Sequence, residues 1–267
     1  SFLVAQYAVL EACARTVSVG ATPVALTDCL CFGNPEKPEQ MWQFAQSCLA
    51  IREACDLLRF NGLKNLPIVA GNVSFYNQSG GQPIPASPMI GCFGKTTKAG
   101  LLKNDFQNSG SNIFLVGGQH SSIGGGVVCD VLNIKNTLIE KFDVKQYCAV
   151  LNGLLSANKA GLLKSCHYVG LGGLAASVSR MSFKNSVGCY IDEISEDLLF
   201  SENLSFVVEV NKESSGSFQK TLKEGGVPFS LVGTTNNTNR VVFDKHIDIN
   251  ISLAKDVWVN SLRERLQ

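Results

Sequence analysis

Hydrophobic residues recur at helical spacing in two segments of the first sixty residues. In the first segment they follow one another at intervals of four and three: Leu3, Tyr7, Leu10, Ala14 and Val17. In the second segment the intervals are three and four: Met41, Phe44, Cys48, Ile51, Cys55 and Leu58. Each set therefore occupies one face of an amphipathic helix, and we expect Gly20 to end the first helix.

Short apolar runs bounded by turn residues separate and follow these helices, and such runs are typical of strands. We expect strands at 24–27, 66–70, 89–94, 112–116, 205–210, 229–232 and 240–243. Further helical patterns cover 135–163, 217–224 and 253–266, and the segment 166–181 has the order strand, glycine turn, helix. This alternation of helices and strands predicts an α/β fold built in packed layers.

A change in proline content marks a boundary inside the chain. Seven of the eight prolines lie within the first 88 residues, and the loop-like sequence GKTTKAG follows at 94–100. We therefore expect two α/β domains, residues 1–98 and residues 99–267. Because Ser1 is not an initiator methionine, we also expect the natural chain to begin further upstream.

The composition is that of a folded globular protein, with 45% apolar and 17% charged residues. A net charge of +1 without a basic block argues against a nucleic-acid partner, and no apolar run approaches the roughly 18 residues of a membrane span. Ten cysteines without a CxxC pair indicate inert thiols in a reducing cytoplasm. A zinc site that combines cysteine with His120, His167 or His246 is less favoured, because no ligand pair has zinc-finger spacing.

The first candidate site is the sequence TDCLCFGNPEKPE at 27–39. We expect a strand to end at Asp28 and a turn to follow at Gly33, Asn34 and Pro35. A carboxylate at the carboxyl edge of a strand is well placed to meet a ligand in an α/β protein. On these residues alone, a simple turn in which Asp28 caps local N–H groups is the more common explanation.

The second candidate site is AGNVSFYN at 70–77, where we expect a buried strand to end. Gly71 allows close approach of backbone or ligand, Asn72 offers a hard oxygen ligand suited to Mg²⁺, and Ser74 offers a hydroxyl group. A turn is again the default explanation. If Asp28 and Asn72 lie at the edges of neighbouring strands, however, they form one polar floor, so the pair is more informative than either part.

Two further segments carry weaker signals. The glycine-rich loop GGQHSSIGGG at 117–126 follows a strand, where backbone N–H groups can hold phosphate. It matches neither GxxxxGK[ST] nor GxGxxG, so a tight turn is the better explanation. His167, in CHYVGLGGLAAS, is a candidate base, but it lacks an acidic partner within the turn, which favours a structural histidine.

The chain as a whole resembles the phosphoribosylformylglycinamidine synthases of the aminoimidazole-ribotide-synthase-like ATP-binding superfamily. The resemblance is dense over 1–94, in GATPVALTDCLCFGNPEKPEQMWQ, AIREACDLL, AGNVSFYN and PASPMIGCFG. It continues through LLKSCHYVGLGGLAASVSRM, LLFSENLSFVVEV and GGVPFSLVG. The family's synthetase chain carries two copies of a two-domain unit whose first domain contributes to a barrel, and this chain resembles the second copy.

The resemblance implies an ATP-dependent carbon–nitrogen ligase of purine biosynthesis, acting in the cytoplasm. Formylglycinamide ribonucleotide, ATP and glutamine-derived ammonia would give formylglycinamidine ribonucleotide, ADP, phosphate and glutamate. Transfer of the γ-phosphoryl group to the amide oxygen creates a leaving group that ammonia displaces. Mg²⁺ neutralises the phosphate charge, while the protein positions the reactants.

Matched position by position, the resemblance assigns Asp28 and Gly71 to ATP, Asn72 to Mg²⁺ and Ser74 to the substrate. In the family the catalytic histidine and most metal carboxylates belong to the first copy. The implied partners are therefore that catalytic half and a glutaminase that supplies ammonia, and we expect the isolated chain to lack ligase activity. A lone half would expose its barrel-forming surface, through which we expect it to self-associate.

The segment HYVGLGG departs from the family's pattern His-Asp-x-Ser-Asp-Gly-Gly, because Tyr168, Gly170 and Leu171 replace two acids and a serine. Loss of both carboxylates predicts that the nucleotide site of this half is degenerate. The stretch LRFNGLKNLP at 58–67 is longer than is usual in the family, and we expect it to extend a surface loop.

Two functions stay open as rivals of a ligase component: a non-catalytic half and another enzyme of the same superfamily. The altered HYVGLGG segment favours a non-catalytic half that braces its partner and holds at most a nucleotide, whereas the intact TDC and GNVS sequences favour a ligase component. Another enzyme of the same superfamily is the third option, and the loop that resembles NFGNP, here CFGNP, argues against it.

Overall fold

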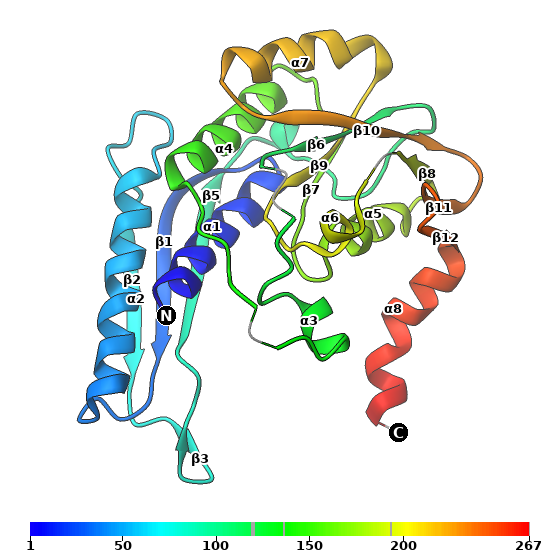
Figure 1. Ribbon diagram of the computed structural model, residues 1–267. Coiled ribbons are helices and arrows are strands. Elements are labelled where there is room, and N and C mark those ends of the chain that lie inside the picture. Colours follow the sequence, from blue (N-terminus) through cyan, green and yellow to red (C-terminus); the bar gives the residue numbers. More distant parts are fainter. Residues whose placement is uncertain (119–120, 136, 193, 267) are drawn as a thin grey trace.

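The computed structural model describes residues 1–118, 121–135, 137–192 and 194–266. It contains two main sheets flanked by helices (Figure 1). The first sheet belongs to the beginning of the chain, and the second is built from the remainder. The α/β fold that the sequence predicts is confirmed. Within the described residues, no helix is both long and apolar enough to cross a membrane.

Three strands form the first sheet in the order β2-β1-β5: β1 (Thr22–Cys31), β2 (Ile68–Ser74) and β5 (Ser87–Lys95). Strand β1 is parallel to β2 and antiparallel to β5. Two helices lie in front of this sheet (Figure 1): α1 (Phe2–Ser18) and α2 (Pro38–Leu57). A small hairpin follows β2: β3 (Gln78–Ser79) and β4 (Gln82–Pro83). Helix α2 thus connects two parallel strands, as a βαβ unit requires.

The strands of the first sheet differ from the predicted ones in extent and exposure. The expected strand at 24–27 extends to Cys31, and the expected strand at 66–70 begins at Ile68 and continues to Ser74. Backbone pairing between β1 and β2 continues through these positions, and side-chain patterns do not reveal where such pairing stops. The prediction that β2 is buried is wrong, because β2 is the edge strand of its sheet and is exposed.

Helix α2 packs through the middle of its predicted apolar face. Ile51 is buried, whereas Met41, near the start of the helix, is 46% exposed and lies outside the core. Phe44 begins the packed region, because its ring meets Phe32 at 5.4 Å and Phe75 at 5.0 Å in edge-to-face contacts. The predicted stripe is therefore correct except at its first residue.

Seven strands form the second sheet in the order β12-β11-β8-β10-β6-β9-β7: β6 (Asn112–Val116), β7 (Ser165–Tyr168), β8 (Gly188–Ile191), β9 (Phe206–Val210), β10 (Phe229–Asn236), β11 (Arg240–Phe243) and β12 (Ile247–Asn250). Strands β8 and β11 run parallel, and the other described neighbours are antiparallel. The sequence analysis did not predict β8 or β12. Both are only four residues long, and β8 (Gly-Cys-Tyr-Ile) has no alternation of apolar and polar residues.

Within the described part of the chain, six α-helices accompany the second sheet: α3 (Val127–Val131), α4 (Val144–Lys159), α5 (Gly173–Ser182), α6 (Glu196–Phe200), α7 (Ser215–Glu224) and α8 (Ile251–Leu266). Alternate residues of β6 face different layers. Phe114 belongs to the core under α1, α4 and α7, whereas Ile113 and Leu115 belong to the core under α5 and α6. Both faces of the central strand are thus covered, which explains its continuous apolar run.

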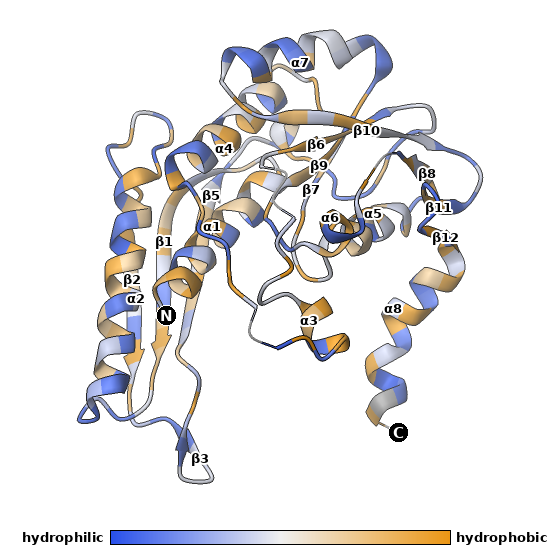
Figure 2. Ribbon diagram, viewed as in Figure 1, coloured by the Kyte–Doolittle hydropathy of each residue, from blue (hydrophilic) through white to orange (hydrophobic). Residues whose placement is uncertain are grey.

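Helix α4 is shorter than the helical pattern at 135–163 predicts. It begins at Val144, where the Asp143 carboxylate accepts hydrogen bonds from the Lys145 and Gln146 N–H groups. This side-chain cap ends the preceding non-helical segment. Helix α8 projects from the body of the molecule, and apolar and polar residues are mixed along it (Figure 2).

Candidate functional site

The four candidate contacts lie at adjacent positions of two paired strands. Asp28 of β1 is opposite Gly71 of β2, and one step further Asn72 is opposite Cys29. Ser74 lies at the end of β2, opposite Cys31. The two candidate segments therefore meet, as expected if they occupy neighbouring strands. Asp28 does not end its strand, however, because β1 continues for three more residues.

The pleat of the strands divides the four residues between two faces of the sheet. Leu26 and Leu30 are buried under the helices, and Asp28 shares their face because side chains alternate along a strand. The Asp28 carboxylate raises the pKa of the Cys48 thiol on α2, after a larger contribution from burial. Asn72 and Ser74 lie on the opposite face of the sheet. The expected single polar floor is therefore not formed, because Asp28 lies on the helix side of the β1–β2 ladder and Asn72 and Ser74 lie on the other side.

Gly71 is a glycine because Asp28 fills the space beside it. A Cβ atom at position 71 would lie 2.5 Å from the Asp28 Oδ1 atom, closer than real Cβ atoms approach any neighbour. The pair therefore holds a carboxylate against bare backbone at the sheet edge. Such an arrangement leaves peptide groups beside a charged oxygen accessible to a ligand.

Backbone hydrogen bonds hold the two strand ends together. The Phe32 N–H group donates to the Ser74 carbonyl at 2.9 Å, and the Tyr76 N–H donates to the Gly33 carbonyl at 3.0 Å. The Asn77 amide donates to the carbonyls of Phe32 at 3.0 Å and Ser74 at 2.8 Å. Sequence analysis did not single out Asn77, although an asparagine that follows a strand is a common sign of such a link.

Asn72 by itself is an incomplete site for Mg²⁺. Its amide lies 3.7 Å from the Cys29 sulfur, and within the described residues no group of three His, Cys, Asp or Glu side chains could hold a metal ion. Mg²⁺ prefers six oxygen ligands, usually carboxylates, phosphates and water. The chain therefore fits Mg²⁺ only as the donor of one ligand to a site that another polypeptide and phosphate groups complete.

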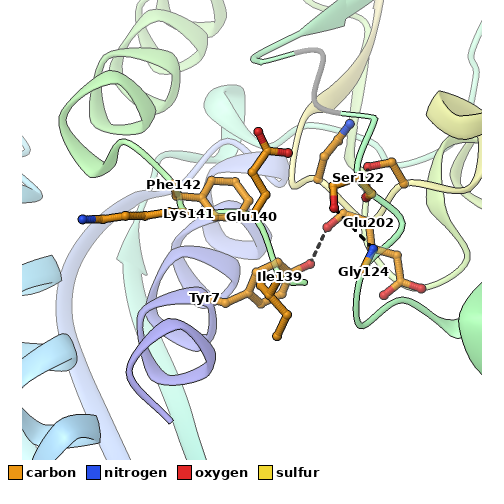
Figure 3. A pocket seen from close by; sticks show the side chains of 10 residues that line it. Tyr7, Ser122, Gly124, Ile139, Glu140, Lys141, Phe142 and Glu202 are labelled. Carbon is orange, nitrogen blue, oxygen red and sulfur yellow. Dashed lines mark hydrogen bonds between the residues drawn. The ribbon is translucent and has the colours of Figure 1, made fainter. Parts of the chain in front are cut away.

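The glycine-rich loop borders a second concave region, next to α1 (Figure 3). A cavity of about 40 Å³ lies between Tyr7, the loop at Ser122 and Gly124, and Phe142, and a neighbouring one of about 190 Å³ shares Tyr7 and Gly124. The Tyr7 hydroxyl donates to the Glu202 carbonyl at 2.8 Å (Figure 3). Burial, then Glu11 and Glu202, raise the pKa of Tyr7. His120, in the same loop, lies outside the described residues.

The Glu202 carboxylate already occupies the N–H groups that could hold a phosphate here. One of its oxygens accepts hydrogen bonds from Val127 N, at the start of α3, at 2.8 Å and from Gly172 N, before α5, at 3.0 Å. An anionic ligand at these helix starts would have to displace a like charge. The loop is thus stabilised by the chain's own carboxylate, in keeping with the tight turn that its sequence favours.

The HYVGLGG segment forms a packed connection instead of an acidic site. Tyr168 is 9% exposed, its hydroxyl donates to a Glu11 oxygen at 3.3 Å, and the Arg15 guanidinium lies 5.0 Å from its ring centre. A Cβ atom on Gly170 would lie 2.5 Å from the same ring. Leu171 is exposed. The aromatic side chain therefore ties β7 to α1 and needs glycine at position 170.

His167 is a structural residue, as the absence of an acidic partner suggested. It is 5% exposed, and its Nδ1–H group donates to the Tyr168 carbonyl at 2.6 Å. Burial lowers the pKa of the imidazole. Burial therefore favours the neutral imidazole, and its Nδ1–H group is already bonded to a backbone carbonyl.

One buried acid escaped the sequence analysis. Glu209 of β9 has no exposed surface, and its carboxylate accepts hydrogen bonds from four groups: Gln107 N, Asn108 N, Ser111 Oγ and Ser165 Oγ. It fastens the segment before β6 to the second sheet. Because all its contacts are internal, Glu209 stabilises the fold and is not a ligand site.

The molecule thus has two sheets flanked by helices, and in the first sheet a carboxylate lies beside the bare backbone of the adjacent strand. Comparison with known proteins gives the class to which this fold belongs. Residues 1–95 match the family described as AIR synthase related protein, N-terminal domain, and residues 108–246 match AIR synthase related protein, C-terminal domain. The chain belongs to the AIR synthase related proteins.

Within this family the chain is similar to phosphoribosylformylglycinamidine synthase subunit PurL. The protein of that name from Campylobacter jejuni subsp. doylei is 33% identical over 268 residues, 98% of this chain and 36% of the relative. The one from Wolinella succinogenes is 38% identical over 240 residues, 88% of this chain and 32% of the relative. The chain thus spans about a third of the length of the curated relatives it matches.

Solved structures share the fold. T. maritima PurL complexed with FGAR aligns with a TM-score of 0.75 at 15% identity, covering 95% of this chain and 43% of that one. Thiamine-monophosphate kinase from Stenotrophomonas maltophilia K279a aligns with a TM-score of 0.65 at 14% identity, covering 91% of this chain and 78% of that one. At these identities the likeness shows the AIR-synthase-like fold alone.

Proposed function

We propose that this chain is the second half of a phosphoribosylformylglycinamidine synthase and that it completes an active site of the first half. The observation that carries the proposal is the β1–β2 register, which places Asp28 opposite Gly71 and Asn72 one step further along. These are the positions that the resemblance assigns to ATP and Mg²⁺. Structures of T. maritima PurL complexed with ATP and with FGAR share this fold and support the proposal.

In the proposed reaction the formylglycinamide ribonucleotide amide is converted to an amidine with ammonia from glutamine, at the expense of ATP. Asp28 and the bare backbone at Gly71 bind the nucleotide, Asn72 supplies one oxygen ligand to Mg²⁺, and Ser74 donates a hydrogen bond to the substrate. Bound Mg²⁺ would neutralise phosphate charge. The residues of this chain orient the reactants, which is the main task of the protein in phosphoryl transfer.

The open face of the first sheet supports a partner half. Met89 and Phe93 are exposed on the face opposite the helices, across from Cys29 and Ala25 of β1. Ile68, Val69 and Val73 are exposed along the edge strand β2. Patches of this kind mark protein interfaces.

We propose that residues 1–98 form the barrel-forming domain and that residues 99–267 form the second domain. The proposed partners are the catalytic half and a glutaminase, both in the cytoplasm. Light scattering should show the isolated chain to self-associate; a clean monomer would contradict this proposal.

Variants of the synthetase reconstituted from both halves test the roles of the strand residues. We expect D28N to raise the KM for ATP, N72A to raise the Mg²⁺ concentration needed for half-maximal activity, and S74A to raise the KM for formylglycinamide ribonucleotide, each by at least about tenfold. S87A, at the far edge of the same sheet, is the matched control and should leave all three constants unchanged. Normal constants in D28N and N72A would refute the proposed site.

The alternative is a non-catalytic half that braces its partner. The packed Tyr168 and the self-bonded Glu202 favour it for the second domain, because both fill places where nucleotide groups would bind. Calorimetry of the isolated chain with ADP and Mg²⁺ separates the possibilities for this domain. We expect no tight binding; tight, Mg²⁺-dependent binding would show that the site of this half is not degenerate.

A further inference from the structure

A cluster of soft ligands lies on the face of the first sheet that the helices leave open. Cys29 and Cys31 are two residues apart on β1, so their side chains share one face, and their sulfur atoms are 3.8 Å apart. Both thiols are free and partly accessible. Neither is among the proposed contacts to nucleotide or substrate.

The separation of the two sulfur atoms fits a shared metal ion. Two thiolates that bind one zinc ion tetrahedrally at about 2.3 Å have sulfur atoms about 3.8 Å apart. The rigid pairing of β1 with strands on both sides holds the two backbone positions in place. A cation could therefore enter between the thiols without a movement of the strand.

The neighbours of Cys29 across the sheet extend the ligand set. Asn72 lies opposite Cys29 on β2, and its amide is 3.7 Å from the Cys29 sulfur. An amide flip, which exchanges the nitrogen and oxygen positions, would direct an oxygen to the same place. Met89 lies opposite Cys29 on β5 and is exposed, so its thioether is on the same face within the reach of cross-strand neighbours.

We propose that Cys29 and Cys31 form a binding site for one thiophilic metal cation of the zinc class. Thiolates select such cations over Mg²⁺ and Ca²⁺, which prefer hard oxygen ligands. On binding, each thiol releases its proton to the solvent and forms one sulfur–metal bond. Water takes the remaining positions, or Asn72 does so when its amide is not bound to Mg²⁺. The site lies beside the proposed nucleotide contacts, but its existence does not depend on the proposed ligase function.

Cys13, Cys92 and Cys48 are less suited than Cys29 and Cys31 to bind a cation. Cys13 and Cys92 form a second close pair, but Cys13 is fully buried and its pair lies in the core between α1 and β5. Cys48 of α2 is half-buried, and no contact to another sulfur is found for it within the described residues. Cys48 is therefore the appropriate control position.

Cobalt(II) tests the proposal, because bound thiolates give it a charge-transfer absorption in the near ultraviolet. The reduced, metal-free chain is titrated with Co²⁺, and Zn²⁺ is then added to displace it. We expect saturation at one equivalent and complete displacement by Zn²⁺. The variants C29S and C31S should each weaken binding by at least about tenfold, since even the partners of ligands contribute this much, and C48S should bind like the unchanged chain.

Two results would overturn the proposal: no charge-transfer band in the unchanged chain, or a band of equal intensity and affinity in the C29S/C31S double variant. Circular dichroism checks the fold of each variant. If C31S does not fold, C31N replaces it, because asparagine stands at this position in NFGNP-like loops. The titration uses neither ATP nor substrate, so its failure leaves the proposed ligase function to be judged by kinetics alone.

Discussion

At the scale of single residues, the clearest constraint is the pair Asp28 and Gly71. A glycine before a polar loop is usually explained by a turn, yet Gly71 lies inside a strand and has no left-handed backbone conformation. A side chain at this position would displace the Asp28 carboxylate, because a Cβ atom there would lie 2.5 Å from its Oδ1 atom. The sequence drew attention to both residues, but only the register shows that they touch.

The variant G71A should lower the free energy of unfolding by about 1–3 kcal/mol, because the added methyl group displaces the carboxylate or shifts the strand. Urea denaturation measures this change. The control is G216A in α7, where a Cβ atom would meet no neighbour and a helical alanine is neutral or stabilising. A G71A chain as stable as the unchanged one would contradict the described contact.

His167 should make the stability of the chain depend on pH. Burial lowers the pKa of its imidazole below the ordinary value of 6.5, so the unfolded chain takes up a proton before the folded chain does. The free energy of unfolding should therefore be unaffected above about pH 6.5 and should fall as the pH drops below it.

Urea denaturation at pH 7.5 and pH 5.5 checks this dependence. In H167N an amide can replace the hydrogen bond to the Tyr168 carbonyl without taking up a proton, so the loss of stability between the two pH values should be smaller. An equal loss in both chains would show that other groups cause the dependence.

At the scale of the elements, the spacing of apolar residues predicted the helices and strands whose positions depend on burying a face of their own. The three–four spacing located α1 and α2, and the apolar run at 112–116 located β6, because each of these elements buries a face of its own. The limits of β1 and β2 were missed, since pairing with a distant strand sets them. Tyr168 likewise gave no sign of its contact with Glu11, which lies 157 residues away in sequence.

Glu209 shows how much of an element's stability comes from such distant contacts. In E209Q the amide nitrogen can no longer accept hydrogen bonds, and it faces N–H or O–H donors. We expect the free energy of unfolding to fall by about 2–4 kcal/mol, since buried donors lose their acceptor. Thermal or urea unfolding measures it, with the exposed E213Q as control; equal stability of the two variants would contradict the assigned network.

At the scale of the whole molecule, the first sheet and the second domain differ in what their polar residues contact. The first sheet pairs Asp28 with Gly71 and leaves one face uncovered by helices, whereas in the second domain Tyr168 bonds to Glu11 and Glu202 bonds to backbone N–H groups of the chain itself. The family could be recognised from sequence, but the reason for the altered HYVGLGG segment could not. A tyrosine in place of an acid gains packing against α1 and loses the charge that a metal-bound nucleotide would need.

We propose that β1 and β2 complete an active site that the other half of the synthetase contains. The most direct measurement is ATP-dependent amidation of formylglycinamide ribonucleotide with ammonium, by this chain alone, by the complementary half alone and by the two combined. We expect product only from the combination, and at least about a hundredfold less product when the chain carries D28N together with N72A. Turnover by this chain alone, or an equally active complementary half without it, would contradict the account.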